Sequence, residues 1–276
     1  MTFIKKSVLY FITIFVGFAF VFPFIWVLLT SLKTDDDIYQ QPIKILPEQF
    51  TLEQYTSIFT KSPELLTFFW NSTLITIISV ALVTIFSGMA GYVIARYKFV
   101  GSKSFFFLLL LVMFVPWVIF LIPIYILEDT LNLVNTRVGL ILPYIALNLP
   151  LGIFIMRGNF NLIPKEIEDA ALVDGCNVFQ MWYKIMLPMV RPGLATVIIL
   201  TGISVWEEFM YARSLITSQE AWTVPVGITM LQQEAQAWAF GTLSAAILLS
   251  LIPLLILFLA FQKYFIKGIT DGSVKG

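Results

Sequence analysis

The hydrophobic pattern of the chain consists of long uncharged runs separated by shorter polar segments. A helix needs roughly 20 apolar residues to cross a hydrocarbon core of about 30 Å. Five uncharged runs meet or approach that length. A sixth run, Pro192 to Trp206, is shorter, ends at Glu207-Glu208 and is interpreted as a span whose outer part is polar. The pattern predicts an all-α integral membrane protein with six transmembrane helices. The five other runs are Ser7 to Leu32, Leu65 to Ala95, Ser104 to Leu127, Val138 to Met156 and Ala235 to Gln262.

Composition supports this interpretation. Of the 276 residues, 59% are hydrophobic and 12% are charged, and the mean hydropathy is +0.89. Soluble globular domains carry roughly 25% charged residues. A water-soluble fold of this composition would expose large apolar patches, so the lipid bilayer is the natural solvent for its surface.

The distribution of Lys and Arg predicts the orientation. Six spans place both termini on the same side, and most of the 17 Lys and Arg residues fall on the side of the N-terminus. Because cytoplasmic loops are enriched in Lys and Arg, both termini are expected to be cytoplasmic, in the inner or plasma membrane of a prokaryote. The apolar run after Lys5-Lys6 is too long for a signal peptide and is interpreted as a retained first helix.

The charge and the residue content of the chain exclude several classes of chemistry. The formal net charge is zero, so nothing favours nucleic acid binding. The chain has no histidine and a single cysteine, Cys176. It therefore lacks the commonest metal ligand and general base and cannot form an intrachain disulfide. No catalytic or metal site is predicted, and a membrane-embedded enzyme is disfavoured.

Two segments are too polar to span. Lys33 to Glu64 is expected outside the membrane, and Thr51-Leu52-Glu53-Gln54 fits a capping box at the start of a short helix. The run Asp35-Asp36-Asp37 is interpreted as a solvated acidic edge. This segment and the first span form a predicted N-terminal part, residues 1–64. The remaining part, residues 65–276, is predicted to be a five-helix core.

The second polar segment, Arg157 to Arg191, is expected inside and reads as two short helices over residues 163–192. Glu166, Glu168 and Asp169 suit the positive end of the first helix dipole. Asp174-Gly175 supplies its end, and Asn177 with Gln180 forms an amide version of the capping box. Pro188 is expected to end the second helix.

The side chains of these two helices suggest contact with another surface. Ala170 and Ala171 let a neighbour approach the backbone, and the second helix is too apolar to lie bare in cytosol. A protein partner and an amphipathic linker on the membrane face both fit this pattern. The apolar residues of the second helix are Val178, Phe179, Met181, Trp182, Ile185 and Met186.

The segment resembles the coupling loop of ABC importer permeases. The matching residues are Asp169-Ala170-Ala171, Asp174-Gly175, Leu187-Pro188 and Pro192. Asp169 stands where that family has glutamate, and Cys176 where it has alanine. Further segments are similar to the carbohydrate branch, the maltose-type second permease, and together they cover Phe22 to Gly276. They include Pro23 to Trp26, Ala90-Gly91-Tyr92, Ala95-Arg96, Asn135-Thr136, Gly139 to Tyr144, Trp206 to Phe209, Thr223 to Gly227 and Lys267 to Gly276.

The resemblance implies a non-catalytic subunit of an ATP-driven sugar importer. Its partners would be a second homologous permease in a heterodimer, two ATPase subunits that bind ATP and Mg, an extracytoplasmic sugar-binding protein that meets the outer loop from Ser214 to Glu234, and membrane lipid. No cofactor is expected in this chain. A bulky residue at Ala170 or Ala171 is expected to uncouple transport. The implied ATPase-coupling residues are Glu168, Asp169, Ala170, Ala171, Asp174 and Gly175.

The polar end of the sixth run is a candidate substrate path. Ionisable groups within a membrane usually face the bundle interior or a water-filled route. Adjacent residues of a helix point about 100° apart, so Glu207 and Glu208 are not expected to face one pore together. An ordinary interfacial belt of aromatic and acidic residues remains an alternative. The candidate substrate-path residues are Trp206, Glu208, Tyr211 and Asn148.

Two rival functions are weighed. The closer rival is a permease of the same family for another solute, such as a polyol, glycerol phosphate or peptide. An ion-coupled secondary transporter would show inverted repeats and acidic residues near the membrane midplane, and neither is visible.

Overall fold

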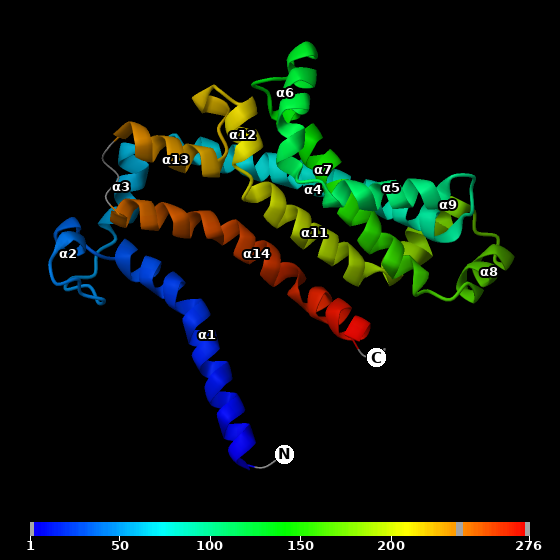
Figure 1. Ribbon diagram of the computed structural model, residues 1–276, viewed down its shortest axis with the longest axis horizontal. Coiled ribbons are helices and arrows are strands. Elements are labelled where there is room, and N and C mark those ends of the chain that lie inside the picture. The colour runs from blue at the N-terminus through cyan, green and yellow to red at the C-terminus, as the bar shows by residue number, and fades with distance from the viewer. Residues whose placement is uncertain (1–2, 236–239, 274–276) are drawn as a thin grey trace. The chain divides into compact units, whose positions relative to one another are not determined.

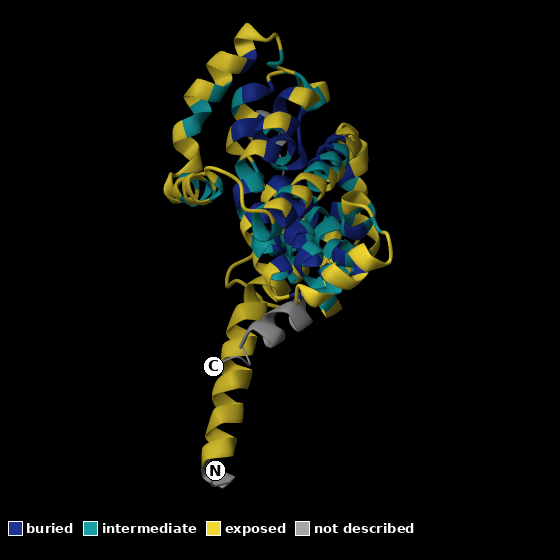
Figure 2. Ribbon diagram, turned by 90° about the vertical axis from the view of Figure 1, so that its right-hand side faces the viewer, coloured by how far each residue is buried: buried dark blue, intermediate teal, exposed yellow. Residues whose placement is uncertain are grey.

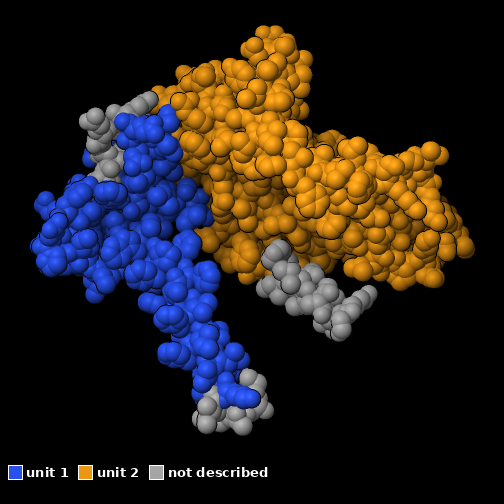
Figure 3. Space-filling model, viewed as in Figure 1, with its two compact units in different colours: residues 1–66, 227–252 blue, residues 67–226, 253–276 orange. Residues whose placement is uncertain are grey.

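The computed structural model describes residues 3–235 and 240–273, and it is helical, with no strand among these residues. Two compact units divide the chain (Figure 3). Unit 1 consists of residues 1–66 and 227–252, and unit 2 of residues 67–226 and 253–276. The predicted division between residues 64 and 65 lies close to the first of these boundaries, whereas the return of residues 227–252 to unit 1 has no counterpart in the sequence pattern.

Unit 1 contains helices α1 (Phe3–Ser31), α2 (Asp35–Tyr39) and α3 (Glu53–Lys61). Helix α1 is exposed along almost its entire length within this unit (Figure 2). It contains no acidic residue, and its side chains beyond Ser7 are almost all apolar. Such a surface is stable in hydrocarbon and not in water, as expected of a membrane span.

The polar part of unit 1 is held together by Gln54. Its amide nitrogen donates to the Lys33 carbonyl at 3.1 Å and to Asp35 Oδ1 at 2.9 Å, and its amide oxygen accepts from Thr242 Oγ1 at 2.7 Å. The predicted capping box at Thr51 is therefore wrong: Leu52 is the N-cap residue, without a side-chain cap bond. Gln54 is used for long-range contacts instead.

Three helices have residues in both units: α4 (Leu65–Arg96), α13 (Val224–Ala235) and α14 (Phe240–Ser273). The remaining elements belong to unit 2 and follow in order in Figure 1. They are α5 (Ser102–Phe114), η1 (Trp117–Phe120), α6 (Leu121–Thr130), α7 (Arg137–Asn161), α8 (Glu166–Val173), α9 (Val178–Gln180), the π-helix η2 (Met181–Met186), α10 (Leu187–Met189), α11 (Arg191–Trp206), α12 (Met210–Leu215) and η3 (Gln219–Ala221).

Four helices of the described chain are long and apolar enough to cross a membrane, and the number rises to six if each of two bent pairs counts as one span. The four are Lys5–Ser31, Leu65–Arg96, Arg137–Asn161 and Phe240–Tyr264. Each covers one of the predicted runs. The last predicted run began at Ala235, and its residues 236–239 lie outside the described part.

The first bent pair corrects the prediction of one continuous span from Ser104 to Leu127. Helices Ser102–Phe114 and Trp117–Thr130 meet at 98°. Val115 between them is extended, with φ −82° and ψ 124°. Pro116 follows Val115 and disfavours the helical conformation for the residue before it, which accounts for the break.

The second bent pair joins Val178–Met189 to Arg191–Trp206 at 78°. Pro188 was predicted to end the helix before the break, but it lies inside α10 and the break falls at Val190. Pro192 lies in the first positions of α11, where a proline costs little because the N–H group would be unpaired, whereas Pro188 lies near the end of the helical run Val178–Met189.

Helices α4 and α7 approach each other closely within unit 2. A Cβ atom on Gly91 would lie 2.6 Å from Met156 Cβ, and one on Gly152 would lie 2.9 Å from Ser87 Cβ. Both distances are shorter than van der Waals contact, so glycine is required at each position. The two backbones are thereby packed at a separation that other residues do not permit.

Candidate functional sites: the pocket at Glu208 and segment 163–192

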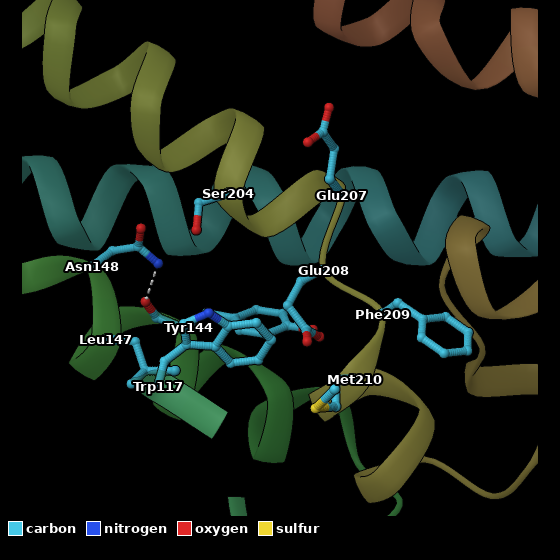
Figure 4. A pocket seen from close by; sticks show the side chains of 9 residues that line it. All are labelled: Trp117, Tyr144, Leu147, Asn148, Ser204, Glu207, Glu208, Phe209 and Met210. Carbon is cyan, nitrogen blue, oxygen red and sulfur yellow. Dashed lines mark hydrogen bonds between the residues drawn. The ribbon is translucent and has the colours of Figure 1, made fainter. Parts of the chain in front are cut away.

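A pocket of about 460 Å³ lies in unit 2 where α11 ends (Figure 4). It is formed by one face of α7, by η1 and by the chain between α11 and α12. The volume is in the range of small-molecule sites, which are lined by aromatic and apolar side chains with a few polar groups. The lining residues are Trp117, Tyr144, Leu147, Asn148, Ser204, Glu207, Glu208, Phe209 and Met210.

The carboxylate of Glu208 is fixed by three donors. Tyr144 donates its hydroxyl at 2.6 Å, and the backbone N–H groups of Tyr211 and Ala212 donate at 2.7 and 3.0 Å. These two N–H groups belong to the first turn of α12, which otherwise has no side-chain cap. A carboxylate satisfies such orphan donors and is favoured by the helix dipole. Glu208 therefore joins α7 to α12.

Tyr211 extends this network to η1. Its hydroxyl donates to the Trp117 carbonyl at 2.8 Å, and its ring stacks on the Trp117 indole at 5.6 Å between centroids. Burial raises the pKa of Tyr211 to about 12, and the negative charge of Glu208 adds to the shift. The phenol consequently remains protonated, and keeps donating to the Trp117 carbonyl, even well above neutral pH.

Two of the four predicted substrate-path residues line this pocket. They are Glu208 and Asn148, although the Asn148 amide also donates to the Tyr144 carbonyl one turn earlier at 2.8 Å. Trp206 and Tyr211 are buried and do not line it. Trp117 and Ser204 were missed, since Trp117 lies far away in the sequence and Ser204 carries no distinctive signal.

The expectation that Glu207 and Glu208 do not face one pore together stays a prediction, although both residues line this pocket. It assumed that the helix continued, whereas α11 ends at Trp206 and the chain from Glu207 to Phe209 is not helical. Figure 4 shows Glu208 directed toward Tyr144 and Glu207 pointing away from Glu208.

Segment 163–192 begins with a helix fastened to the end of α4. Arg96 Nε lies 2.5 Å from Glu168 Oε1, and Arg96 also donates from Nη2 to the Ile163 carbonyl at 2.7 Å. The Nε–Oε1 contact lacks hydrogen-bond geometry, so charge attraction carries it. The side chains of Arg96 and Glu168 are 6% and 16% exposed, which limits screening by solvent. No local sequence pattern predicts this contact between Arg96 and Glu168.

Local features of this segment follow the sequence prediction. Helix α8 ends at Val173, and Gly175 adopts a φ of 82°, the left-handed conformation that favours glycine. Asn177 accepts from the Gln180 N–H while the Gln180 side chain accepts from the Asn177 N–H, which forms the predicted capping box.

The second part of the segment is partly covered by the same chain. Met181 and Met186 are buried, and the Met181 sulfur accepts a hydrogen bond from Tyr92 of α4 at 3.3 Å. Trp182 Nε1 donates to the Gly88 carbonyl of α4 at 3.4 Å. The apolar residues of this helix are therefore divided between an inner face against α4 and an outer face that includes Val178 and Phe179.

The predicted coupling residues differ in exposure. Asp169, Ala170, Asp174 and Gly175 are exposed, Glu168 is bound to Arg96, and Ala171 is buried at 4% exposure. Together with Leu172, Val173, Val178 and Phe179, the exposed residues form what we term the outer face of segment 163–192. This face combines carboxylates with uncovered apolar side chains.

A polar loop between α12 and α13 is also held rigidly. Asn135 Oδ1 accepts from the N–H groups of Thr217 and Ser218, both at 3.0 Å. Asn71 of α4 donates to the carbonyls of Glu220 and Trp222 at 2.8 and 3.0 Å. The loop thus presents a fixed shape.

No group of three metal-ligating side chains is found among the described residues. The fold, the apolar helices and the two sites together define a polytopic α-helical membrane protein with a pocket at a helix break and a polar segment fixed to one end of a span.

Comparison with known proteins identifies the family. Residues 87–271, more than half of the chain, match the family of binding-protein-dependent transport system inner membrane components. The chain is 36% identical over 95% of its length to the arabinooligosaccharides transport system permease protein AraQ of Halalkalibacterium halodurans, covering 94% of that protein. It is 32% identical over 99% of its length to the trehalose/maltose transport system permease protein MalG of Thermococcus litoralis, covering 98% of it.

The fold is similar to that of a solved bacterial ABC transporter that imports the acidic polysaccharide alginate. The TM-score is 0.81 at 23% identity, with 95% of this chain and 96% of that chain covered. A second structure of an alginate ABC transporter, in complex with an alginate-bound periplasmic protein, gives a TM-score of 0.68 at 15% identity, with 93% of each chain covered.

This chain belongs to the family of binding-protein-dependent transport system inner membrane components, and it is a multi-pass permease of the ABC importer type. The predicted family and all-α fold are confirmed. Its relatives are permease subunits, which leave ATP hydrolysis to separate ATPase subunits, so the prediction of a non-catalytic subunit is also confirmed. Membership removes the ion-coupled secondary transporter from consideration.

Proposed function

We propose that this chain is one of two permease subunits of an ATP-driven sugar importer. The observation that carries the sugar assignment is that relatives similar over nearly the whole chain are named for sugars: arabinooligosaccharides, trehalose, and trehalose with maltose. The solute passes between this chain and a second homologous permease in a heterodimer. Two ATPase subunits bind ATP and Mg and supply the energy.

The outer face of segment 163–192 is the proposed ATPase contact. Its support is the combination of exposed apolar side chains with Asp169 and Asp174 on a segment that the ion pair from Arg96 fixes to α4. ATP-driven closure of the ATPase pair moves this segment, and α4 moves with it because of the ion pair. The segment and both termini are then cytoplasmic, in agreement with the distribution of Lys and Arg.

The loop at Glu220 is the proposed contact for an extracytoplasmic sugar-binding protein. Its support is the rigidity that Asn71 and Asn135 give it. A preformed loop loses little conformational entropy when a partner binds. The pocket at Glu208 lies where α11 ends, immediately before this loop in the sequence, and forms part of the sugar path.

Uptake energetics test the proposal. The complete transporter, reconstituted in liposomes with ATP inside and its binding protein outside, is expected to take up radiolabelled sugar. Vanadate, which blocks the ATPase cycle, is expected to abolish this uptake, whereas a proton ionophore is expected to leave it unchanged. Uptake that survives vanadate and stops with the ionophore would refute the assignment.

Substitutions at Ala170 and Ala171 distinguish a contact with the ATPase subunit from packing within this chain. Ala170→Trp is expected to reduce sugar-stimulated ATP hydrolysis at least tenfold with unchanged thermal stability, because Ala170 is exposed on the proposed contact. Ala171→Trp overfills a buried site and is expected to cost about 1–3 kcal/mol of stability. The sequence-based expectation that both positions act through the partner is replaced by this division. Normal coupling in Ala170→Trp would move the contact elsewhere.

A further inference from the structure

The two carboxylates of the pocket differ in how they are bonded. Glu208 accepts three hydrogen bonds and is fixed in the wall. Glu207 is exposed, and its carboxylate makes no hydrogen bond or ion pair with any described residue. Glu207 is also the C-cap residue of α11, where the helix dipole disfavours a negative charge. The carboxylate of Glu207 therefore stabilises neither the fold of unit 2 nor helix α11.

The rest of the lining carries no compensating charge. None of the nine lining residues is Lys or Arg. Trp117 and Phe209 are 45% and 38% exposed, and Ser204 and Asn148 contribute a hydroxyl and an amide. Aromatic surfaces with a few polar groups suit a polyhydroxylated ligand, whose C–H faces pack on rings while its hydroxyls bond to the neutral hydroxyl and amide of the lining.

We propose that Glu207 selects solutes by charge, so that this pocket admits uncharged polyhydroxylated solutes and rejects anionic ones. The inference rests on the proposed sugar path and deepens it by naming the substrate class. An anionic solute would meet two negative groups and no positive one, and like charges brought together at a partly desolvated site repel strongly. An uncharged sugar meets no such repulsion, and its hydroxyls can bond to the Ser204 hydroxyl and the Asn148 amide.

The shared fold does not decide this question. The solved transporter with a TM-score of 0.81 imports an acidic polysaccharide, so the same architecture serves an anionic solute in that protein. The charge of the admitted solute must therefore depend on individual lining residues rather than on helix arrangement. In this chain Glu207 is the residue with a free charge in the pocket.

The test measures the local charge without needing the natural sugar. Cys176 is the single cysteine, so Cys176→Ser provides a background in which Ser204→Cys places one thiol in the pocket, one helical turn before Glu207. In the purified complete transporter, a cationic methanethiosulfonate is expected to modify this thiol about tenfold faster than an anionic one of similar size. Adding Glu207→Gln is expected to reduce that ratio at least threefold. Asp129→Asn, an exposed carboxylate outside the pocket, is the matched control and should leave the ratio unchanged.

Transport provides the second measurement. Arabinotriose, trehalose and maltose serve as neutral probes, and Glu207→Gln is expected to keep uptake of the transported probe within about threefold of wild type, since the side chain repels anions rather than binding the sugar. Three results would each overturn the inference: a reagent ratio unaffected by Glu207→Gln, a thiol in the Ser204→Cys variant that reacts with neither reagent, or complete loss of neutral-sugar uptake in Glu207→Gln. Failure of the wild-type transporter to take up any sugar would instead refute the proposed function, because the reagent ratio does not depend on sugar uptake.

Discussion

Replacing Arg96 with glutamate is expected to reduce both sugar uptake and sugar-stimulated ATP hydrolysis at least tenfold. The substitution places a second negative charge beside Glu168 in a site where these side chains are 6% and 16% exposed. Leaving one partner of a buried ion pair without its counter-charge costs about 3–5 kcal/mol. Helix α8 would then lose its attachment to the end of α4, and motion of the ATPase subunits would reach α4 only through the remaining contacts of Met181 and Trp182.

The exchange of both charges distinguishes this role from a simple folding defect. Arg96→Glu combined with Glu168→Arg restores opposite charges and is expected to recover a substantial part of the lost activity. Lys98→Glu is the matched control, because Lys98 is exposed two residues further along and makes no ion pair among the described residues. If the double variant is no more active than Arg96→Glu alone, in protein that reaches the membrane at wild-type levels, the ion pair does not transmit motion.

Removing the carboxylate of Glu208 is the second change with a large expected effect. In Glu208→Ala the Tyr144 hydroxyl and the N–H groups of Tyr211 and Ala212 lose their acceptor. Each buried donor left unpaired costs about 1–3 kcal/mol. We expect a clear fall in the melting temperature of the detergent-solubilised protein and at least a tenfold loss of uptake, because α12 is no longer joined to α7.

A graded series checks this interpretation. Glu208→Gln keeps one carbonyl oxygen but turns an NH₂ group toward donors, so it should lie between wild type and Glu208→Ala. The adjacent Glu207→Ala is the control for stability, since that carboxylate has no partner in the described chain, and its melting temperature should match wild type. Equal stability of Glu208→Ala and wild type would show that the three hydrogen bonds do not hold α12.

Most of the helical architecture was predictable because hydrophobic burial in lipid dominates it. The predicted runs that end at Leu32, Ala95 and Met156 correspond to helices that end at Ser31, Arg96 and Asn161. The two bends were not predicted. The run from Ser104 to Leu127 was predicted to be one continuous span, and Pro188 was predicted to end a helix. Whether a proline bends, breaks or merely starts a helix depends on the neighbouring elements, which one segment of sequence does not contain.

In the two candidate sites, features that depend on adjacent residues were predictable, and contacts between distant parts of the chain were not. Local features such as the turn at Gly175 and the capping box at Asn177 depend on a few adjacent residues and were predicted correctly. The contacts of Glu168 with Arg96 and of Glu208 with Tyr144 join distant parts of the chain, so no local pattern revealed them. The expected angle of about 100° between Glu207 and Glu208 assumed helical geometry past Trp206, where the helix ends.

The close packing of α4 against α7 has a mechanical consequence. Gly91 and Gly152 bring the two backbones together so tightly that neither helix can slide or roll on the other without atomic overlap. A displacement applied at Arg96 is therefore expected to move α4 and α7 together. Because Tyr144 and Asn148 of α7 line the pocket at Glu208, we expect this wall of the pocket to shift whenever segment 163–192 moves α4.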